Sequence, residues 1–455
     1  MDALEDDQIP CLLEKLMNGN DITEDEIEST ITKLIQSCHA PHLNRAEDVP
    51  YERSDFLGVA FTAKRRLDIL CRILEELNNS QNKGEKFSFL FKKNIIIRSL
   101  LLASEYSENE WEWSSKEAAL SAKNVIQILC QFASVPTLKK LLCGEPEDSE
   151  SCAINYLECA LQTLTSAFNK KSWKKCVAAR ASYWFILLNL DEKCLGNYLT
   201  YLLPPALFIV DDWEQRNKIF GLKCLHHILQ NTTGAEIRWY GRGMVIYEAI
   251  KNLLHSREVK VLEALYPTLI LVAEVLESDP EYTGHLRSVS TYDTIMQQLI
   301  QEMRHEQNIA LRITYSAALP ALLNAMGILS LKWSVEIIPM FEDYLATYSG
   351  PKSEDRINIL KGMQVYIQKS WPQIHANATS ILKIILRLLY DVTSQESDLD
   401  DQIRQNLIKE ALQVVRLLHA AAPKTTRKLC EDLASVEVHP QCQCLLREID
   451  KIVSP

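Results

Sequence analysis

The stretch that decides the fold runs from residue 204 to residue 230 and reads PPALFIVDDWEQRNKIFGLKCLHHILQ. A proline pair opens an apolar segment, an aspartate pair interrupts it, and an amphipathic segment follows. Asp212 is a good N-cap residue, and Gln215 three positions later would complete a capping box. The second segment places its apolar residues at the spacing of one helical face: Phe220, Cys224, Leu225 and Ile228. The stretch therefore predicts a helix–turn–helix unit.

The same pattern returns towards the end of the chain. Residues 339–365 again lead with a proline and an apolar segment, turn, and continue into an amphipathic segment. Residues 372–418 repeat the pattern around an acidic turn. Helix pairs with an aspartate-containing turn and a polar residue early in the second helix, at ~40–47 residues per repeat, are typical of HEAT arrays. We therefore predict an all-α fold, a HEAT-like or armadillo-type α-α superhelical solenoid.

Helical periodicity extends over most of the chain, and strand periodicity is almost missing. Only 13 of the 455 residues are glycine, which disfavours hairpins and glycine-rich loops. A length of 455 residues exceeds one ordinary compact core, because single cores stop growing at ~250–300 residues. The periodicity is weaker at the start. We therefore expect an N-terminal helical cap over residues 1–90 and a HEAT-like repeat array over residues 91–455.

Charge and hydropathy disfavour several classes of partner. The net charge is −11, and an acidic surface repels the phosphates of nucleic acid. The longest apolar runs, at 198–210 and 262–275, contain prolines and fall short of the ~18–20 residues that span a bilayer. The acidic N-terminus does not have the pattern of a signal peptide, and the 13 cysteines suit a reducing compartment. We expect a cytoplasmic and nuclear protein with no nucleic-acid or membrane partner.

Catalytic and metal-binding motifs are incomplete. Gly241 and Gly243 begin a dinucleotide fingerprint, but Ile246 stands where its third glycine belongs. A zinc-protease-like motif starts at His305, but Ile309 replaces its second histidine. The cysteines and histidines near the two ends do not supply the four ligands of a structural zinc site. We therefore predict no enzyme activity, no cofactor and no metal.

The residues around the aspartate pair form the candidate site. Gly221 falls inside a helix, where glycine costs ~1 kcal/mol relative to alanine, which indicates a neighbouring helix passing close by. His226 and His227 point about 100° apart on a helix, so we expect one to pack against a neighbouring helix and the other to face outward. Contact with a partner and bridging between repeats are both open roles. The candidate residues are Asp211, Asp212, Asn217, Lys218, Gly221, His226 and His227.

A longer stretch around the opening motif, LPPALFIVDDWEQRNKIFGLKCLHHILQN at 203–231, closely resembles the signature region of the Tel-two-interacting protein two family. Further similarity lies at 172–174, at 312–329 and from 348 to 372, in the same order along the chain. The first 90 residues show no matching pattern. The resemblance implies a HEAT-like subunit of the TTT complex that joins the Tel-two and Tti-one proteins.

The same resemblance implies a role in chaperoning. Members of the family act with the ninety-kilodalton heat-shock chaperone and its R2TP adaptor, and they support the maturation and stability of phosphatidylinositol-3-kinase-related kinases. The subunit itself is expected to be a non-catalytic scaffold. A transport or adaptor solenoid that binds protein cargo alone and reversibly is the alternative. An enzyme would need a polar pocket with several convergent titratable groups, and the sequence shows no such set.

Overall fold

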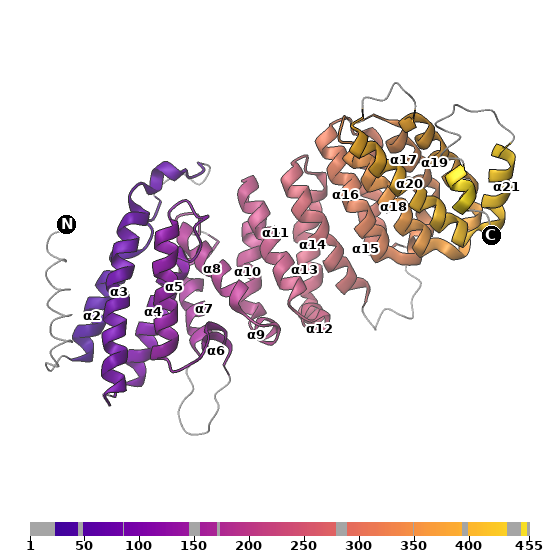
Figure 1. Cartoon of the computed structure of the whole chain (residues 1–455). Helices are drawn as coiled ribbons and strands as arrows, with labels where there is room; N and C mark the ends of the chain where they lie inside the picture. Colours follow the sequence, from indigo (N-terminus) through magenta and orange to yellow (C-terminus); the bar gives the residue numbers. More distant parts are fainter. Residues whose placement is uncertain are drawn as a thin grey trace. The chain divides into compact units, whose positions relative to one another are not determined.

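The computed structural model describes residues 23–43, 49–84, 86–144, 155–170, 173–278, 289–348, 350–393, 399–434 and 447–452. Within these ranges all regular secondary structure is helical, which confirms the predicted fold class (Figure 1). The chain divides into two compact units, Met1–Glu236 and Ile237–Pro455. The division predicted from the sequence, a cap over residues 1–90 and a repeat array over residues 91–455, stays a prediction.

Unit 1 is a succession of packed helices. Its α-helices are α2 Glu24–Cys38, α3 Val59–Asn82, α4 Phe89–Tyr106, α5 Lys116–Phe132, α6 Leu138–Cys143, α7 Tyr156–Ala167, α8 Val177–Asn189, α9 Glu192–Asn197, α10 Leu199–Val210 and α11 Gln215–Gln230, with a 3-10 helix η1 at Arg53–Phe56. The first helices continue directly into the rest of the unit, because α2 packs against α4 and α3 packs against α5. Further along, α4 packs against α8, and α10 against α11.

Unit 2 begins within α12 (Gly234–Arg238). Its other α-helices are α13 Arg242–Ile250, α14 Val259–Glu277, α15 Thr291–His305, α16 Ile309–Met326, α17 Ser334–Ala346, α18 Glu354–Ser370, α19 Ala378–Thr393, α20 Asp401–Ala421 and α21 Pro423–Ala434, and its 3-10 helices are η2 Trp239–Gly241, η3 Lys251–His255, η5 Gly327–Trp333 and η6 Trp371–Ala376. The helices form two layers. One layer runs through α14, α16, α18 and α20, and the other through α15, α17, α19 and α21.

Local sequence explains where many helices begin. Ser88, Ser115 and Thr137 each accept a hydrogen bond from a backbone N–H in the first turn of α4, α5 and α6, a group that otherwise has no partner within the helix. Ser290 and Asp293 form a reciprocal capping box at the start of α15. Short polar side chains therefore fix these starts, as the helical pattern predicts.

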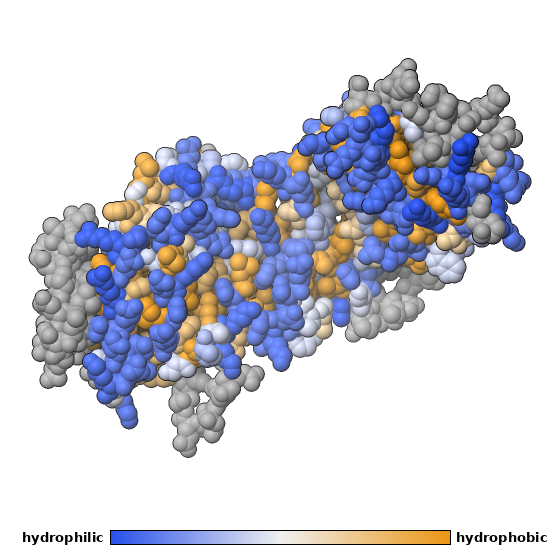
Figure 2. Space-filling model, in the orientation of Figure 1, coloured by the Kyte–Doolittle hydropathy of each residue, from blue (hydrophilic) through white to orange (hydrophobic). Residues whose placement is uncertain are grey.

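Apolar burial holds the layers together. Between α16 and α18, Leu319, Leu323, Met363 and Tyr366 are all completely buried. Burying one such side chain contributes ~1.5–3 kcal/mol. On the surface drawn in Figure 2, apolar residues appear in strips between polar ones, as expected of helices that bury only one stripe.

The proline pair does not open a helix, so that prediction is wrong. α10 begins at Leu199, and Pro204 and Pro205 lie inside it. Proline removes a backbone donor but keeps a helical φ. Burial of Leu199, Leu202 and Leu203 in the turns before the prolines extends the helix in the N-terminal direction.

One segment, Ile309–Ala346, is long and apolar enough by composition to cross a membrane. In the structure this segment is not one helix but α16, η5 and α17, with a positive φ at Gly327 between them. α16 packs against α14 and α18, and α17 packs against α15 and α19. Its apolar composition therefore serves helix packing within unit 2.

Candidate partner-binding site

The two aspartates of the turn before α11 have different environments. The Asp211 side chain is 75% exposed and lies 4.0 Å from the Lys170 ammonium, which is 79% exposed. An ion pair this exposed contributes only ~0–1 kcal/mol. Asp211 is therefore open to solvent, and its contact with Lys170 does little for stability.

Asp212 is buried and links helices rather than capping one. Its Oδ1 lies 2.5 Å from Lys174 Nζ, and its Oδ2 accepts a 2.6 Å hydrogen bond from Asn217 Nδ2. Glu214 is the residue before α11, and no side chain caps that helix. The predicted N-cap at Asp212 and capping box with Gln215 are therefore wrong. With both oxygens engaged, the Asp212 carboxylate is held away from the first-turn N–H groups.

Arg180 of α8 completes this network. It is only 3% exposed. Its guanidinium donates a 2.6 Å hydrogen bond to Asn217 Oδ1 and another to the Tyr51 hydroxyl. Asn217 thus connects Arg180 to Asp212, whose charge is paired with Lys174, while the partners of Arg180 itself are the neutral Asn217 and Tyr51. Three aromatic rings surround the guanidinium, with centroids 5.4–5.5 Å from its carbon: Tyr51, Trp111 and Phe220.

Gly221 lies where α11 meets α10, as the sequence predicted. A Cβ at this position would stand 2.6 Å from the backbone nitrogen of Val210 and 2.8 Å from its Cα. Real Cβ atoms do not approach backbone this closely, so only glycine fits without a shift of the helix. Gly221 therefore serves repeat packing.

The histidine pair divides in part as expected. His227 packs inward: its Nε2 lies 3.1 Å from the Leu187 carbonyl, and its ring meets Trp184 edge-on at 6.0 Å. His226 is half-buried rather than exposed. Burial lowers the pKa of both imidazoles, which also lie beside each other in sequence. Lys218 is half-buried; its backbone N–H donates to the Glu214 carbonyl, and among the described residues its side chain has no ion pair or hydrogen bond.

A groove of about 920 Å³ opens beside the Arg180 network, wholly within unit 1. Three helices each present one stripe of side chains to it. These stripes are Lys116, Leu120 and Lys123 of α5, Arg180, Trp184 and Leu188 of α8, and Arg216, Ile219, Phe220 and Lys223 of α11. The loop between α4 and α5 adds Glu108, Glu110 and Trp111 to the lining. Residues spaced by three, four or seven positions face the same way on a helix.

The floor of the groove is aromatic. Trp111 stacks on Trp113 with ring centroids 5.3 Å apart, and it meets the edge of Phe220 at 5.9 Å. Phe220 in turn meets Trp184 at 5.7 Å. Leu120 is 63% exposed and Leu188 is 38% exposed at the walls. The groove thus offers rigid apolar surface to solvent.

Charges of both signs line the groove. Lys123 and Lys223 are exposed on α5 and α11, and Glu108, Glu110 and Glu112 come from the loop between α4 and α5. Arg216 is engaged already, 2.9 Å from Glu112 and 3.4 Å from Glu214. Burial and the neighbouring Glu110 carboxylate raise the pKa of Glu108, although Lys123 and a hydrogen bond with Trp184 oppose that shift.

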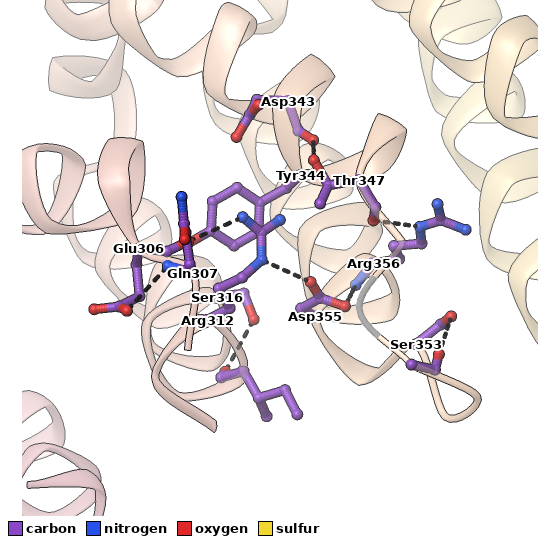
Figure 3. Close-up of polar contacts among 12 residues, drawn as sticks. Glu306, Gln307, Arg312, Ser316, Asp343, Tyr344, Thr347, Ser353, Asp355 and Arg356 are labelled. Atoms are coloured by element: carbon purple, nitrogen blue, oxygen red, sulfur yellow. Dashed lines mark hydrogen bonds and ion pairs between the residues drawn. The ribbon is translucent and has the colours of Figure 1, made fainter. Parts of the chain in front are cut away.

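Unit 2 contains two buried arginines, Arg312 and Arg356, both shown in Figure 3. The Arg312 Nε of α16 lies 3.4 Å from Asp355 Oδ2 of α18, and both side chains are nearly inaccessible. The guanidinium carbon sits 3.9 Å from the ring centroid of Tyr344. Glu306, whose carbonyl accepts from Arg312, forms a 2.6 Å ion pair with Arg257. The contact of Arg312 with Asp355 thus joins α16 to α18, which are consecutive helices of one layer.

One group of metal-ligand type occurs among the described residues. Cys143, Asp191 and Cys194 hold three potential ligand atoms within 4.8 Å of one another. The Asp191 carboxylate already caps α9 through a 2.9 Å hydrogen bond from the Cys194 N–H. Three ligands are one fewer than a structural zinc site uses. His439, Cys442 and Cys444, noted in the sequence, lie outside the described residues.

The fold and these buried arginine networks define a HEAT-type helical repeat protein. Solved structures agree at the level of fold. A structure of yeast importin-beta (Kap95p) superposes with a TM-score of 0.51 at 16% identity, covering 98% of this chain and 54% of that one. A Kap95p structure concerned with RanGDP gives a TM-score of 0.55 at 15% identity, covering 98% of this chain and 50% of that one.

The family model of the Tti2 family matches residues 156–350. TELO2-interacting protein 2 of Homo sapiens is 29% identical over 331 residues, which cover 71% of this chain and 64% of that protein. The Rattus norvegicus protein of the same name is 28% identical over 323 residues, covering 71% and 62%. The resemblance to the Tel-two-interacting protein two family is therefore confirmed, and this chain spans under two thirds of the length of these relatives.

A plant protein is also similar. An uncharacterized protein of Arabidopsis thaliana is 22% identical over 418 residues, covering 86% of this chain and 88% of that protein. The match to the Tti2 family model includes the α8 and α11 walls of the groove, whereas the α5 wall and the loop that bears Trp111 precede the matched residues. The family match and the groove therefore overlap in part.

Proposed function

We propose that this chain is a non-catalytic scaffold subunit that binds a TELO2 homologue and, with a Tti-one homologue, forms a TTT-type complex. The observation that carries the proposal is the match to the Tti2 family over residues 156–350, on a helical solenoid. Solenoids suit this work because stacked helix pairs present extended surfaces to other proteins. We expect the complex in the cytoplasm and the nucleus.

The wider role follows from the same family. We propose that the complex works with the ninety-kilodalton heat-shock chaperone and R2TP to mature phosphatidylinositol-3-kinase-related kinases. The chain contacts these proteins indirectly, through its two partners. Depletion of the chain should lower the steady-state amounts of these kinases several-fold without changing their messenger RNA. If the kinase amounts are unchanged in fully depleted cells, the proposed role in kinase maturation is wrong.

Affinity purification tests the central claim. The full chain is tagged in the cells it comes from, purified at moderate salt, and its partners are identified by mass spectrometry. TELO2 and Tti-one homologues should be recovered in near-equal amounts to the chain. Recovery of a varying cargo without these two proteins would instead support a transport or adaptor solenoid.

Lys218 tests whether the 211–227 segment touches a partner. The residue is half-buried and has no ionic partner among the described residues, so Lys218→Glu should leave the melting temperature unchanged while reducing recovery of the TELO2 homologue. Lys139→Glu, an exposed lysine on α6, is the matched control. A fall in melting temperature for Lys218→Glu alone would show that the residue bridges repeats instead.

A further inference from the structure

The groove of unit 1 is a break in an otherwise continuous helix layer. In unit 2 the helices α14, α16, α18 and α20 each pack directly on the next, and in unit 1 α3 packs on α5 in the same manner. α5 and α8 are not a closely packed pair among the described residues; α5 packs on α3, α4 and α6, and α8 on α4, α6, α7 and α11. The loop bearing Trp111 lies at this break.

The faces of α5 and α8 that line the groove carry apolar side chains of the kind that a neighbouring helix normally covers. Leu120 and Leu188 face the groove with 63% and 38% of their surfaces exposed, whereas most leucines in these helices are buried. The stripe from Lys116 to Lys123 covers eight residues of α5, which span about 10 Å at ~1.5 Å per residue. The opening thus matches about two turns of an added helix.

The charged side chains of the groove indicate which kind of helix would fit there. Lys123 and Lys223 flank the aromatic floor from opposite walls, and among the described residues neither forms an ion pair or hydrogen bond with another side chain. Glu108 and Glu110 belong to the loop between α4 and α5, and Glu108 accepts a hydrogen bond from Trp184 and lies near Lys123. An acidic group of a partner is therefore repelled on the Lys123 side and attracted on the Lys223 side. Arg180 forms part of the floor, and its Nε has no hydrogen-bond partner although the side chain is 3% exposed. Nucleic acid fits poorly, because its phosphates would meet the two glutamates.

We propose that this groove binds an amphipathic α-helix of the TELO2 homologue, with its apolar stripe on Trp111, Trp184 and Phe220 and an acidic residue facing Lys223. The proposal rests on the proposed function and adds the surface and the chemistry of the contact. Helices that enter grooves present anchors at positions i, i+3 or i+4, and i+7. A basic residue of the helix that faces Glu108 and Glu110 sets its register, since complementary charges fix register.

Exposed groove residues allow a test that does not disturb the core. The full chain is co-expressed with the TELO2 homologue of the same organism, and recovery of that protein is measured for wild type, Leu120→Asp and Lys223→Glu. The matched controls are Leu90→Asp, since Leu90 on α4 is also 63% exposed, and Lys139→Glu. We expect each groove variant to lose about tenfold or more in affinity, with both controls at the wild-type level and all melting temperatures unchanged.

A photo-crosslinking amino acid at position 120 gives a second measurement in an otherwise wild-type groove. It should crosslink to one helical peptide of the TELO2 homologue, and the same amino acid at position 90 should not. If Leu120→Asp recovers the TELO2 homologue at the wild-type level, the groove is not the binding site, and the proposed function is unaffected. Failure of the wild-type chain to recover the TELO2 homologue overturns both. Crosslinks from position 120 to a second copy of this chain also overturn the groove assignment.

Discussion

Two arginines occupy matching places in the two units. Arg180 is the fourth residue of α8 and Arg312 is the fourth residue of α16. Each reaches a polar side chain in the first turn of a later helix, Asn217 in α11 and Asp355 in α18. Each also lies against aromatic rings. A buried arginine thus links two helices in each unit. Its acceptor is the neutral Asn217 in unit 1 and the Asp355 carboxylate in unit 2.

Removing one partner of the unit 2 pair should be costly. Asp355→Ala leaves the Arg312 guanidinium buried without its counter-charge, and such a change costs ~3–5 kcal/mol. The double variant Arg312→Leu with Asp355→Leu should recover much of that loss, because no isolated charge remains. Chemical denaturation measures both. A single variant as stable as wild type would show that solvent reaches the pair.

A second residue makes the stability of unit 1 depend on pH. His39 Nδ1 lies 2.7 Å from Glu105 Oε1. Burial lowers the pKa of His39, but the hydrogen bond and charge of Glu105 outweigh it and raise the pKa above 6.5. The folded state thus binds the proton more tightly than the unfolded state. The resulting stability is fully present below the unfolded pKa and is lost as pH rises through the folded pKa.

His39→Gln should therefore show its largest deficit in slightly acid solution. Its free energy of unfolding should lie below that of wild type at about pH 6 and approach it above about pH 8. His42→Gln is the control, because His42 is exposed. A deficit that grows with pH would reverse the assigned sign and point to a neutral imidazole in the folded chain.

Sequence reasoning found part of this residue-scale picture. The spacing of residues 211–227 identified Asp212, Asn217 and Gly221, all of which are buried. It assigned Asp212 to the wrong role, because capping residues look alike in sequence whether or not another side chain competes for them. It missed Tyr51, which lies 129 positions from Arg180. No periodicity connects two residues that far apart.

At the scale of elements, the contact between α10 and α11 depends on close backbone approach. Gly221→Ala gains helix propensity of ~1 kcal/mol but places a methyl group 2.6 Å from the Val210 nitrogen. Overpacking costs ~1–3 kcal/mol, so we expect a net loss of stability in thermal unfolding.

Gly362 of α18 is the natural comparison. A Cβ there would meet Leu319 side-chain carbons at 3.5 and 3.7 Å, which is ordinary contact. Gly362→Ala should therefore raise stability by roughly 0.5–1 kcal/mol. If the two alanine variants shifted the melting temperature equally, propensity alone would explain both, and the close approach at Gly221 would not matter.

At the scale of elements, the sequence predicted correctly that the segments are helices, but it predicted poorly where the helices begin and end. The helix pairs predicted at 339–365 and 372–418 are α17 with α18 and α19 with α20. The prolines misled at α10, since burial of the residues before them outweighed the lost donors. The side chains that line the groove could not be predicted from the sequence for a different reason. α8 is apolar almost all round, so its sequence does not show that the side bearing Trp184 and Leu188 stays uncovered.

At the scale of the whole molecule, the division into two units predicts local responses to damage. Repeat arrays are stabilised chiefly by nearest neighbours. Asp355→Ala should therefore speed amide hydrogen exchange in α16, α18 and α20, while α3, α4 and α5 exchange as in wild type. Equal acceleration in both units would mean that they unfold as one cooperative body.

The aromatic floor of the groove also allows binding at this surface to be followed by intrinsic tryptophan fluorescence. Two of the chain's 8 tryptophans, Trp111 and Trp184, line the groove. Indole emission moves to shorter wavelength when water leaves its surroundings. Docking of any tryptophan-free segment over this floor would therefore register as a blue shift, so binding can be followed optically without attaching a label to either protein.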